Sequence, residues 1–252
     1  MNKIAVISML SLIVGFTACS PDESVQTGEA QLNFKLEYGG NPLVVDAAYD
    51  YQSNSVRFSE FNFIYSNLKL LRADGSSVDL EEVGYLDFGD TNTEESAVNG
   101  LNKSFVDLPM GSYTGISFTY GLDDSYLDKT PADFSTDNVL SNAGLYWVAW
   151  GNYIICKLEA RFESNGDGLY DDASFQYHLG GDTAFRTITI DREFDLITDG
   201  ITSIDLVLDL RKILLIDNEL IDPFEFNNTH TSDMEWLISD LLDNVQTEFV
   251  AE

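Results

Sequence analysis

Short segments in which every second residue is apolar recur along most of the chain. The first lies just after residue 30, where Leu32, Phe34, Leu36 and Tyr38 alternate with polar residues. A period of two is typical of a β-strand with one buried face, because successive side chains of a strand point to opposite faces. Turn residues separate these segments, and short strands at such spacing favour an antiparallel β-sandwich over alternating strands and helices. We therefore expect a mostly β fold, an antiparallel sandwich of the immunoglobulin-like or Greek-key type.

Local signals add detail to this expectation. The alternation that starts at Val56 changes phase near Glu60, as a β-bulge would cause. The pair Asp74-Gly75 predicts a tight hairpin turn. Residues 89–104 and 121–143 are mainly polar and are predicted to be loops, and a loop as long as the second one is usually functional.

One helix is predicted, near the C-terminus. Ser232 to Glu235 fits a capping box, in which the Ser and Glu side chains satisfy backbone N–H groups at the start of a helix. Apolar residues at helical spacing follow, and they predict a face that packs on the sheet: Met234, Leu237, Ile238, Leu241, Leu242 and Val245.

The N-terminal residues are predicted to lie outside the fold. Residues 1–18 have a charged start and a short apolar run, which is typical of a signal peptide. Small residues directly before Cys19 resemble the cleavage box of bacterial lipoproteins, so Cys19 is expected to carry a lipid; ordinary signal-peptide cleavage near Ala18 is the alternative. Residues 19–30 are predicted to be an acidic flexible tether and 31–252 a single domain. With Cys19 so used, Cys156 is expected to be a buried thiol without a disulfide partner.

The charge balance is strongly acidic. The chain has 43 Asp and Glu residues against 13 Lys and Arg, a formal net charge of −30. A nucleic-acid partner is excluded, because binding phosphates requires a basic face, whereas cation binding is favoured. Glu163, Asn165, Asp167 and Asp171 place oxygen ligands along a loop with Gly168 in its sixth position, which resembles the start of a calcium loop. A solvated hairpin turn is the favoured alternative, because a polar Ser stands in the twelfth position where such loops carry Glu.

Aromatic residues and histidines supply the other candidate site. Two of the three Trp residues, Trp147 and Trp150, lie beside Tyr146, and this density indicates either a core strand or the wall of a site. The chain has only two histidines, His178 and His230. Imidazoles near aromatic walls suit copper or zinc. No phosphate loop, nucleophile elbow or zinc helix is present, so an enzyme is not expected.

Five segments, in order along the chain, resemble segments of the periplasmic methanobactin-partner (MbnP-like) family of copper-binding proteins. They are Phe61–Leu70 ending in Asp74-Gly75; Pro109–Tyr113 with Phe118, Gly121 and Asp123; Leu145–Trp147 through Tyr153 and Lys157–Glu159; Phe175–Gly180; and His230 with Asp243, Asn244 and Phe249. The chain departs from the family pattern at Leu145, where Met is usual, at Asn152, where the Gly before Tyr is usual, and at Ala160, where Gly is usual.

The resemblance implies a β-sandwich that binds copper through histidines. His178 and His230 would then be metal ligands, and Trp147 is at the position of the family's characteristic Trp beside them. Trp150 and Tyr146 would extend the aromatic wall. In some members a di-haem enzyme partner oxidises a Trp to kynurenine. Because of these departures, loss of metal binding in this chain is the alternative to copper binding.

Two functions therefore compete, and an adhesion module stiffened by calcium is a minor third. The first is an envelope-anchored copper-binding lipoprotein, monomeric and held at the outer membrane through Cys19, on its periplasmic or its outer face. The second is a surface lipoprotein without metal that binds a glycan or a protein through the Trp-rich stretch and the 121–143 loop. The second function requires Trp147 and Trp150 to be accessible and far from both histidines.

Overall fold

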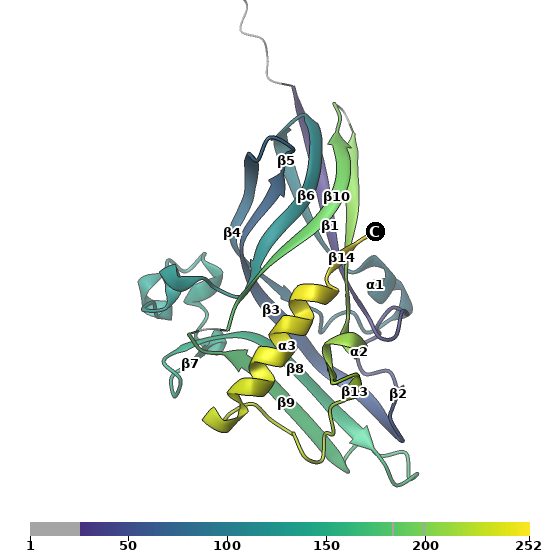
Figure 1. The fold of residues 1–252 in the computed structure, drawn as a ribbon. Helices are drawn as coiled ribbons and strands as arrows, with labels where there is room; N and C mark the ends of the chain where they lie inside the picture. The colour runs from purple at the N-terminus through teal and green to yellow at the C-terminus, as the bar shows by residue number, and fades with distance from the viewer. Residues whose placement is uncertain (1–25, 183, 199) are drawn as a thin grey trace, which may run out of the picture.

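The computed structural model describes residues 26–182, 184–198 and 200–252. Its strands and helices (Figure 1) are β1 (Thr27–Glu37), β2 (Tyr49–Tyr51), β3 (Asn54–Leu71), β4 (Ser77–Asp87), α1 (Glu94–Asn99), β5 (Leu101–Pro109), β6 (Gly111–Tyr120), β7 (Tyr146–Trp147), β8 (Asn152–Glu163), β9 (Ala173–Gly180), β10 (Arg186–Leu196), β11 (Ile201–Asp209), α2 (Leu210–Ile213), β12 (Leu215–Ile216), β13 (Glu219–Leu220), α3 (Glu235–Glu248) and β14 (Val250–Ala251). Short 3-10 turns are Asp124–Tyr126, Pro131–Asp133, Val139–Ser141, Ala143–Leu145 and Ser232–Met234. The predicted signal peptide and Cys19 lie outside the described residues. Among the residues described, no helix is long and apolar enough to cross a membrane.

Two main sheets carry the fold. The smaller has the strand order β14-β11-β1-β5, and the larger has the order β10-β6-β3-β8-β7, with β2 and β4 also paired to β3 and β9 paired to β8. The mostly β, mainly antiparallel architecture with a C-terminal helix is confirmed. One pair differs from the prediction, because β1 and β11 run parallel, with Phe34 opposite Leu206. Alternation along a strand indicates which face is buried, but it does not reveal the direction of the neighbouring strand.

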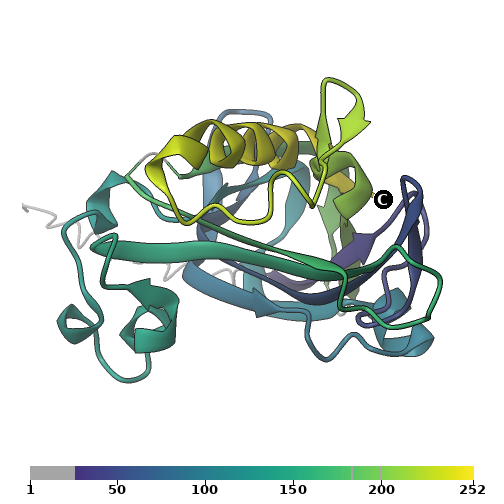
Figure 2. The same cartoon turned by 90° about the horizontal axis from the view of Figure 1, so that it is seen from below.

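The core lies between the two sheets and is rich in aromatic rings. Phe34 of β1 packs against Phe63 and Tyr65 of β3 and against Phe118 of β6. The alternation predicted for β1 is observed, with Leu32, Phe34 and Leu36 buried. Figure 2 shows α3 lying across one face of the larger sheet, and its predicted apolar residues Leu237 to Val245 form the buried side of the helix.

Local predictions fared differently. The pairing of β3 with β8 shifts register between Phe58 and Glu60, which confirms the bulge, and β3 and β4 are joined by a turn with Gly75 at φ 83°. The first strand begins at Thr27, so residues 27–30 belong to β1 and not to the tether. The 121–143 loop contains 3-10 turns, and its Leu122, Tyr126 and Leu140 form a second apolar cluster with Tyr153 of β8.

The starts of the helices differ most from the prediction. Ser232–Met234 is a 3-10 turn, and α3 begins at Glu235 without a side-chain cap. A reciprocal capping box occurs instead at α1, within the predicted loop 89–104, where Thr93 and Ser96 satisfy each other's backbone N–H groups. Ser at the third helical position takes the part that Glu or Gln usually plays, so the sequence pattern did not reveal it.

Cys156 is expected to be unreactive in the folded protein. It lies on β8 with 2% of its surface exposed, and burial raises the pKa of its thiol to about 12. The thiolate is the reactive form, so almost none is present at pH 8. With a chain that begins after Cys19, a thiol reagent should label Cys156 only after guanidinium unfolding. Rapid labelling of the native chain would contradict this burial.

Candidate metal centre

His178 is presented by β9, a strand that is buried on alternate positions. Phe175 and Tyr177 are fully buried, which turns His178 and Gln176 to the opposite face, as the alternation predicted. On the adjacent strand β8, the carboxylate of Glu159 lies 2.8 Å from His178 Nε2. A carboxylate can only accept, so His178 Nε2 carries the hydrogen, and in the neutral ring Nδ1 is then the nitrogen with the free lone pair. Glu159 therefore fixes both the ring orientation and the free nitrogen of His178.

His230 is held by an extended segment that runs beside β9. The N–H of Gln176 donates to the carbonyl of Asn227 at 2.8 Å, and the hydroxyl of Thr229 donates to the carbonyl of His178 at 2.7 Å. The N–H of His230 donates to Asn228 Oδ1 at 3.1 Å. These bonds fasten the segment to the sheet, so a residue far along the chain is brought to the side of His178.

The two imidazoles face each other through their nitrogens. His230 Nε2 lies 3.2 Å from His178 Nδ1, and the ring centroids are 4.8 Å apart. When both rings are neutral, His178 Nδ1 is the acceptor and His230 Nε2–H is the donor. The chain's only two histidines, separated by 52 positions, therefore converge on one point.

Trp147 packs on both histidines. Its ring is edge-on to that of His230, with 4.8 Å between the ring centroids and 88° between the ring planes. The corresponding values for His178 are 6.1 Å and 72°. Trp150 packs against Trp147, with 4.3 Å between the ring centroids. The turn after the two Trp residues contains Gly151, whose backbone has the left-handed conformation with φ 67°. Both Trp residues are half-buried.

Tyr146 lies elsewhere. Its ring packs on Tyr153 at 5.1 Å, within the apolar cluster of the 121–143 region. The structure thus brings together four of the five predicted residues, and Tyr146 stays apart because adjacent residues of a strand point to opposite faces.

The electrostatics favour a neutral imidazole at His230. Burial lowers its pKa, the positive charge of a protonated His178 would lower it further, and Glu159 acts weakly in the opposite direction. Metal binding requires the neutral form of His, since the proton competes for the same lone pair.

A family model, MbnP, matches residues 27–235, a span that includes Trp147 and both histidines. The chain belongs to the MbnP family. A solved structure, MbnP from Methylosinus trichosporium, is similar with a TM-score of 0.50 and 16% identity, over 75% of this chain and 78% of that one. At that identity the likeness shows the fold alone. None of the curated proteins matches the chain.

The residues of this candidate centre fit a metal ion in part. Two imidazole nitrogens bound about 2.0 Å from a tetrahedral ion such as Zn²⁺ lie about 3.3 Å apart, close to the 3.2 Å between His178 Nδ1 and His230 Nε2. Among the described residues, no group of three or more His, Cys, Asp or Glu is placed to hold a metal. The described residues therefore offer two nitrogen donors and an aromatic wall, and an ion held there would need water or an external ligand to complete its coordination.

Gly180 makes room for Trp150. A Cβ at Gly180 would lie 2.6 Å from Trp150 Cζ3 and 2.8 Å from the carbonyl oxygen of Tyr153, closer than such atoms can approach. Gly180→Ala is expected to displace Trp150 and to lower the free energy of unfolding by about 1–3 kcal/mol. Denaturant unfolding and near-ultraviolet circular dichroism of the Trp pair would measure both effects.

Gly89→Ala is the matched control for that substitution. Its Cβ would meet only Asp87 Oδ1, at 3.2 Å, and that side chain can move. The control should change the free energy of unfolding by less than about 0.5 kcal/mol. Equal effects of the two substitutions would show that Gly180 has no special role in seating Trp150.

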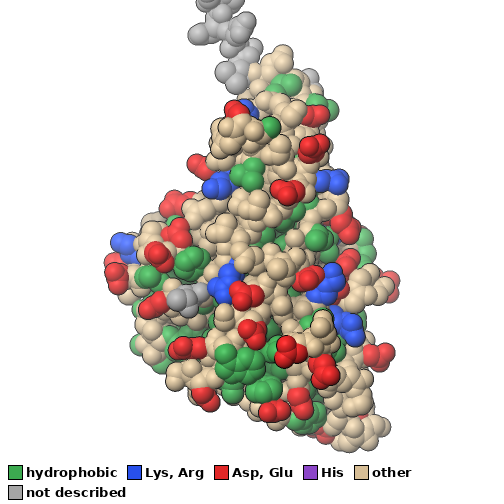
Figure 3. Space-filling model, in the orientation of Figure 1, with side chains coloured by type: hydrophobic (Ala, Val, Ile, Leu, Met, Phe, Trp, Pro, Cys, Tyr) green, Lys and Arg blue, Asp and Glu red, His purple; other side chains and the backbone are tan. Residues whose placement is uncertain are grey.

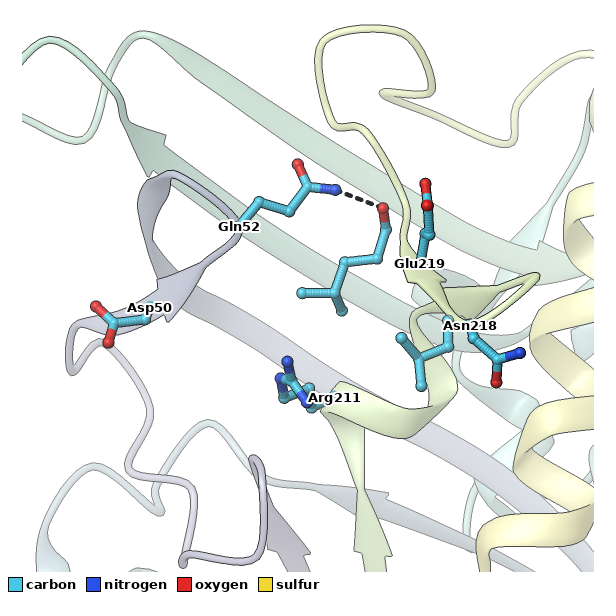
Figure 4. Close-up of a pocket in the computed structure, with 7 residues that line it drawn as sticks. Asp50, Gln52, Arg211, Asn218 and Glu219 are labelled. Carbon is cyan, nitrogen blue, oxygen red and sulfur yellow. Dashed lines mark hydrogen bonds between the residues drawn. The ribbon is translucent and has the colours of Figure 1, made fainter.

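Two cavities differ in their relation to the centre. A cavity of about 630 Å³ opens beside His230 and Trp150, and its other walls include Thr231, Ser232 and Glu235. A second, of about 430 Å³, is lined by Asp50, Gln52, Arg211, Leu215, Asn218, Glu219 and Leu220 (Figure 4). The second lies where β2 meets β13, across the molecule from β7 (Figure 1). It contains neither histidine, so only the first offers access to the candidate centre.

The predicted calcium loop is the turn between β8 and β9. Asn165 and Asp167 each accept hydrogen bonds from loop N–H groups, and Glu163 accepts one from Gly166. Asp172, which was not among the predicted ligands, accepts from Ser164 and Asn165. These oxygens satisfy the turn's own backbone, and Asp171 does not join them in a metal-binding group within the described residues. Calcium is not supported, and the hairpin alternative accounts for the loop.

Three residues of the centre escaped prediction. Glu159 was one carboxylate among many, and its contact with His178 depends on the pairing register of β8 with β9. Asn228 and Thr229 position His230 through contacts that are distant in sequence. A signal was present in the strand alternation of β8, which puts Glu159 on the polar face, but that signal does not select a partner.

Proposed function

We propose that this MbnP-family chain is an envelope-anchored protein that binds copper through His178 and His230. One observation carries the proposal: the chain's only two imidazoles meet with 3.2 Å between their nitrogens, against the ring of Trp147. Imidazole is a suitable ligand for copper. A copper ion bound there would supply one-electron chemistry.

Each neighbouring residue has a defined part in this function. Glu159 holds His178 with Nδ1 directed at His230, and a carboxylate in this position also makes an imidazole a stronger donor. The hydroxyl of Thr229 ties the His230 segment to β9. Trp147, which packs against Trp150, covers one side of the imidazole pair and limits the approach of water. The cavity beside His230 is the route by which copper and its remaining ligand enter.

Equilibrium dialysis with Cu(I) and Cu(II) tests the proposal. The mature chain should retain copper, whereas a double variant with His178→Ala and His230→Ala should retain only what the acidic surface holds weakly. Uptake by the double variant equal to that of the parent chain would refute the proposal.

The metal-free alternative, a glycan or protein site at the Trp-rich stretch, loses its main requirement. Trp147 and Trp150 are half-buried, and Trp147 is in contact with both histidines. A free aromatic platform would leave these rings exposed to a ligand.

The proposal extends to an anchor and a partner, which the signal-peptide pattern before Cys19 and the family resemblance support. A lipid on Cys19 holds the chain at the outer membrane, and a di-haem oxidase of the kind found with some relatives acts on Trp147. Radiolabelled fatty acid should enter the parent chain and not a Cys19→Ser variant. Intact mass of the chain purified from its own host should show the shift of one Trp to kynurenine, and peptide mapping should place it at Trp147; an unmodified mass would remove the oxidase from the proposal.

A further inference from the structure

An exposed aromatic patch lies at the N-terminal end of α3. It consists of Phe226 and Trp236, whose rings are in contact, and of Phe224 on the same turn as Phe226; we call these three residues the aromatic patch. Phe224 is 52% exposed and Trp236 is 42% exposed. The ring of half-buried Phe226 is edge-on to that of Trp236, with 5.4 Å between the ring centroids and 82° between the ring planes. Figure 3 shows hydrophobic side chains gathered over the lower part of the face that carries α3, with carboxylates around them. Contiguous aromatic surface that is exposed to water and surrounded by polar residues is typical of an interaction site.

Carboxylates predominate around the aromatic patch. Residues 213–252 include no Lys or Arg. The carboxylates nearest to the patch in sequence make no salt bridge among the described residues; they are Asp222, Glu225, Asp233, Glu235 and Asp240. Farther along α3, Asp243 pairs with Arg186 at 2.6 Å and Glu248 pairs with Lys212 at 3.0 Å. The rim of the patch is therefore rich in carboxylates, and Arg186, which lines the neighbouring cavity with Glu235, is paired with Asp243.

We propose that the aromatic patch docks a basic protein surface, with an apolar centre that covers Trp236 and Lys or Arg residues that meet the acidic rim. Trp in the centre of a polar ring is the residue type that most often dominates binding at protein interfaces. Complementary charge at the rim accelerates association and selects the partner. A second copy of this chain would bring the same acidic rim and a net charge of −30 to the interface, and would be repelled.

Docking at this patch reaches the metal centre through one turn. Thr231, Ser232 and Glu235 line the cavity beside His230, and Trp236 follows them directly. A partner seated on Trp236 therefore lies against the turn that forms one wall of that cavity. The docking proposal does not depend on copper and goes beyond the proposed function.

Nuclear magnetic resonance titration of the metal-free, ¹⁵N-labelled mature chain tests the proposal with two synthetic peptides. One peptide has lysines on both sides of a central Leu-Phe pair, and the other has the same lysines around Ser-Ser. The first should bind more tightly, with shifts concentrated at residues 222–240, and its affinity should fall with added salt. Trp236→Ser should lower the affinity for the first peptide by at least about tenfold. The double variant with Asp233→Asn and Glu235→Gln should show a smaller loss of peptide affinity with added salt.

Val106→Ser is the matched control, since Val106 is 62% exposed on β5 and lies outside the aromatic patch. It should leave peptide binding unchanged. Circular dichroism should confirm that each variant, altered only at exposed side chains, is folded. The proposal is overturned if both peptides bind equally, if shifts spread over the whole acidic surface, or if Trp236→Ser and Val106→Ser behave alike. It is also overturned if Trp236 instead mediates self-association in sedimentation experiments.

Discussion

Replacing either His178 or His230 with Ala is expected to lower the affinity for copper by about 100- to 10,000-fold. The two nitrogens lie 3.2 Å apart, so once one imidazole binds, the other is present at a high effective concentration. Removing either one leaves a single-point site. Glu159→Gln should lower the copper affinity by a smaller factor, about 10- to 100-fold, because it loosens the orientation of His178 but leaves both nitrogens in place. Competition with a coloured Cu(I) chelator measures all three affinities.

Glu219→Gln is the control for charge in that series. Glu219 is an exposed carboxylate on β13, in the wall of the cavity that lacks histidines. Its loss changes the net charge as Glu159→Gln does, yet it should leave copper affinity unchanged. If both Ala variants bound copper as tightly as the parent chain, the histidine pair would have no part in binding.

Phe63→Ala is expected to lower the free energy of unfolding by about 3–5 kcal/mol. Phe63 is fully buried at the centre of the core and contacts six other rings: Phe34, Phe61, Tyr65, Phe88, Tyr120 and Phe249. Truncation leaves a cavity between two sheets that cannot close around it. A domain has only about 5–15 kcal/mol of stability in total, so this single change removes a large part. Urea unfolding followed by Trp fluorescence gives the value.

Phe63→Leu keeps most of the side-chain volume and should lower the free energy of unfolding by less than Phe63→Ala does. It provides a folded comparison if the Ala variant fails to accumulate. Val106→Ala, at an exposed position on β5, should change the free energy by less than about 0.5 kcal/mol. A loss below about 1 kcal/mol for Phe63→Ala would mean that the core can repack around Phe63.

The sequence predicted those parts of the fold that depend on local pattern. The alternation of β1 correctly identified its buried residues, and the change of phase at Glu60 correctly identified a bulge. Features set by distant partners were not predictable. The parallel pairing of β1 with β11 depends on the path of the whole chain between them. The start of β1 at Thr27 was missed because Thr27–Gly28 resembles tether but pairs with β5.

The candidate centre divides in the same way. Strand alternation put His178 on the polar face of β9, and the family resemblance singled out Trp147 and His230. The meeting of these three residues required the tertiary fold, since the segment before α3 is held to β9 by bonds such as that from Thr229 to the carbonyl of His178. Glu159 contacts His178 only through strand pairing, and the family resemblance included it in the segment Lys157–Glu159 without giving it a role at the site.

X-ray absorption spectroscopy of the copper-loaded mature chain tests the central claim most directly. The account predicts nitrogen ligands about 2.0 Å from copper, with the outer-shell scattering that imidazole rings produce, and the loss of that scattering when His178 and His230 are both Ala. A copper ion surrounded only by oxygen, unchanged in the double variant, would contradict it.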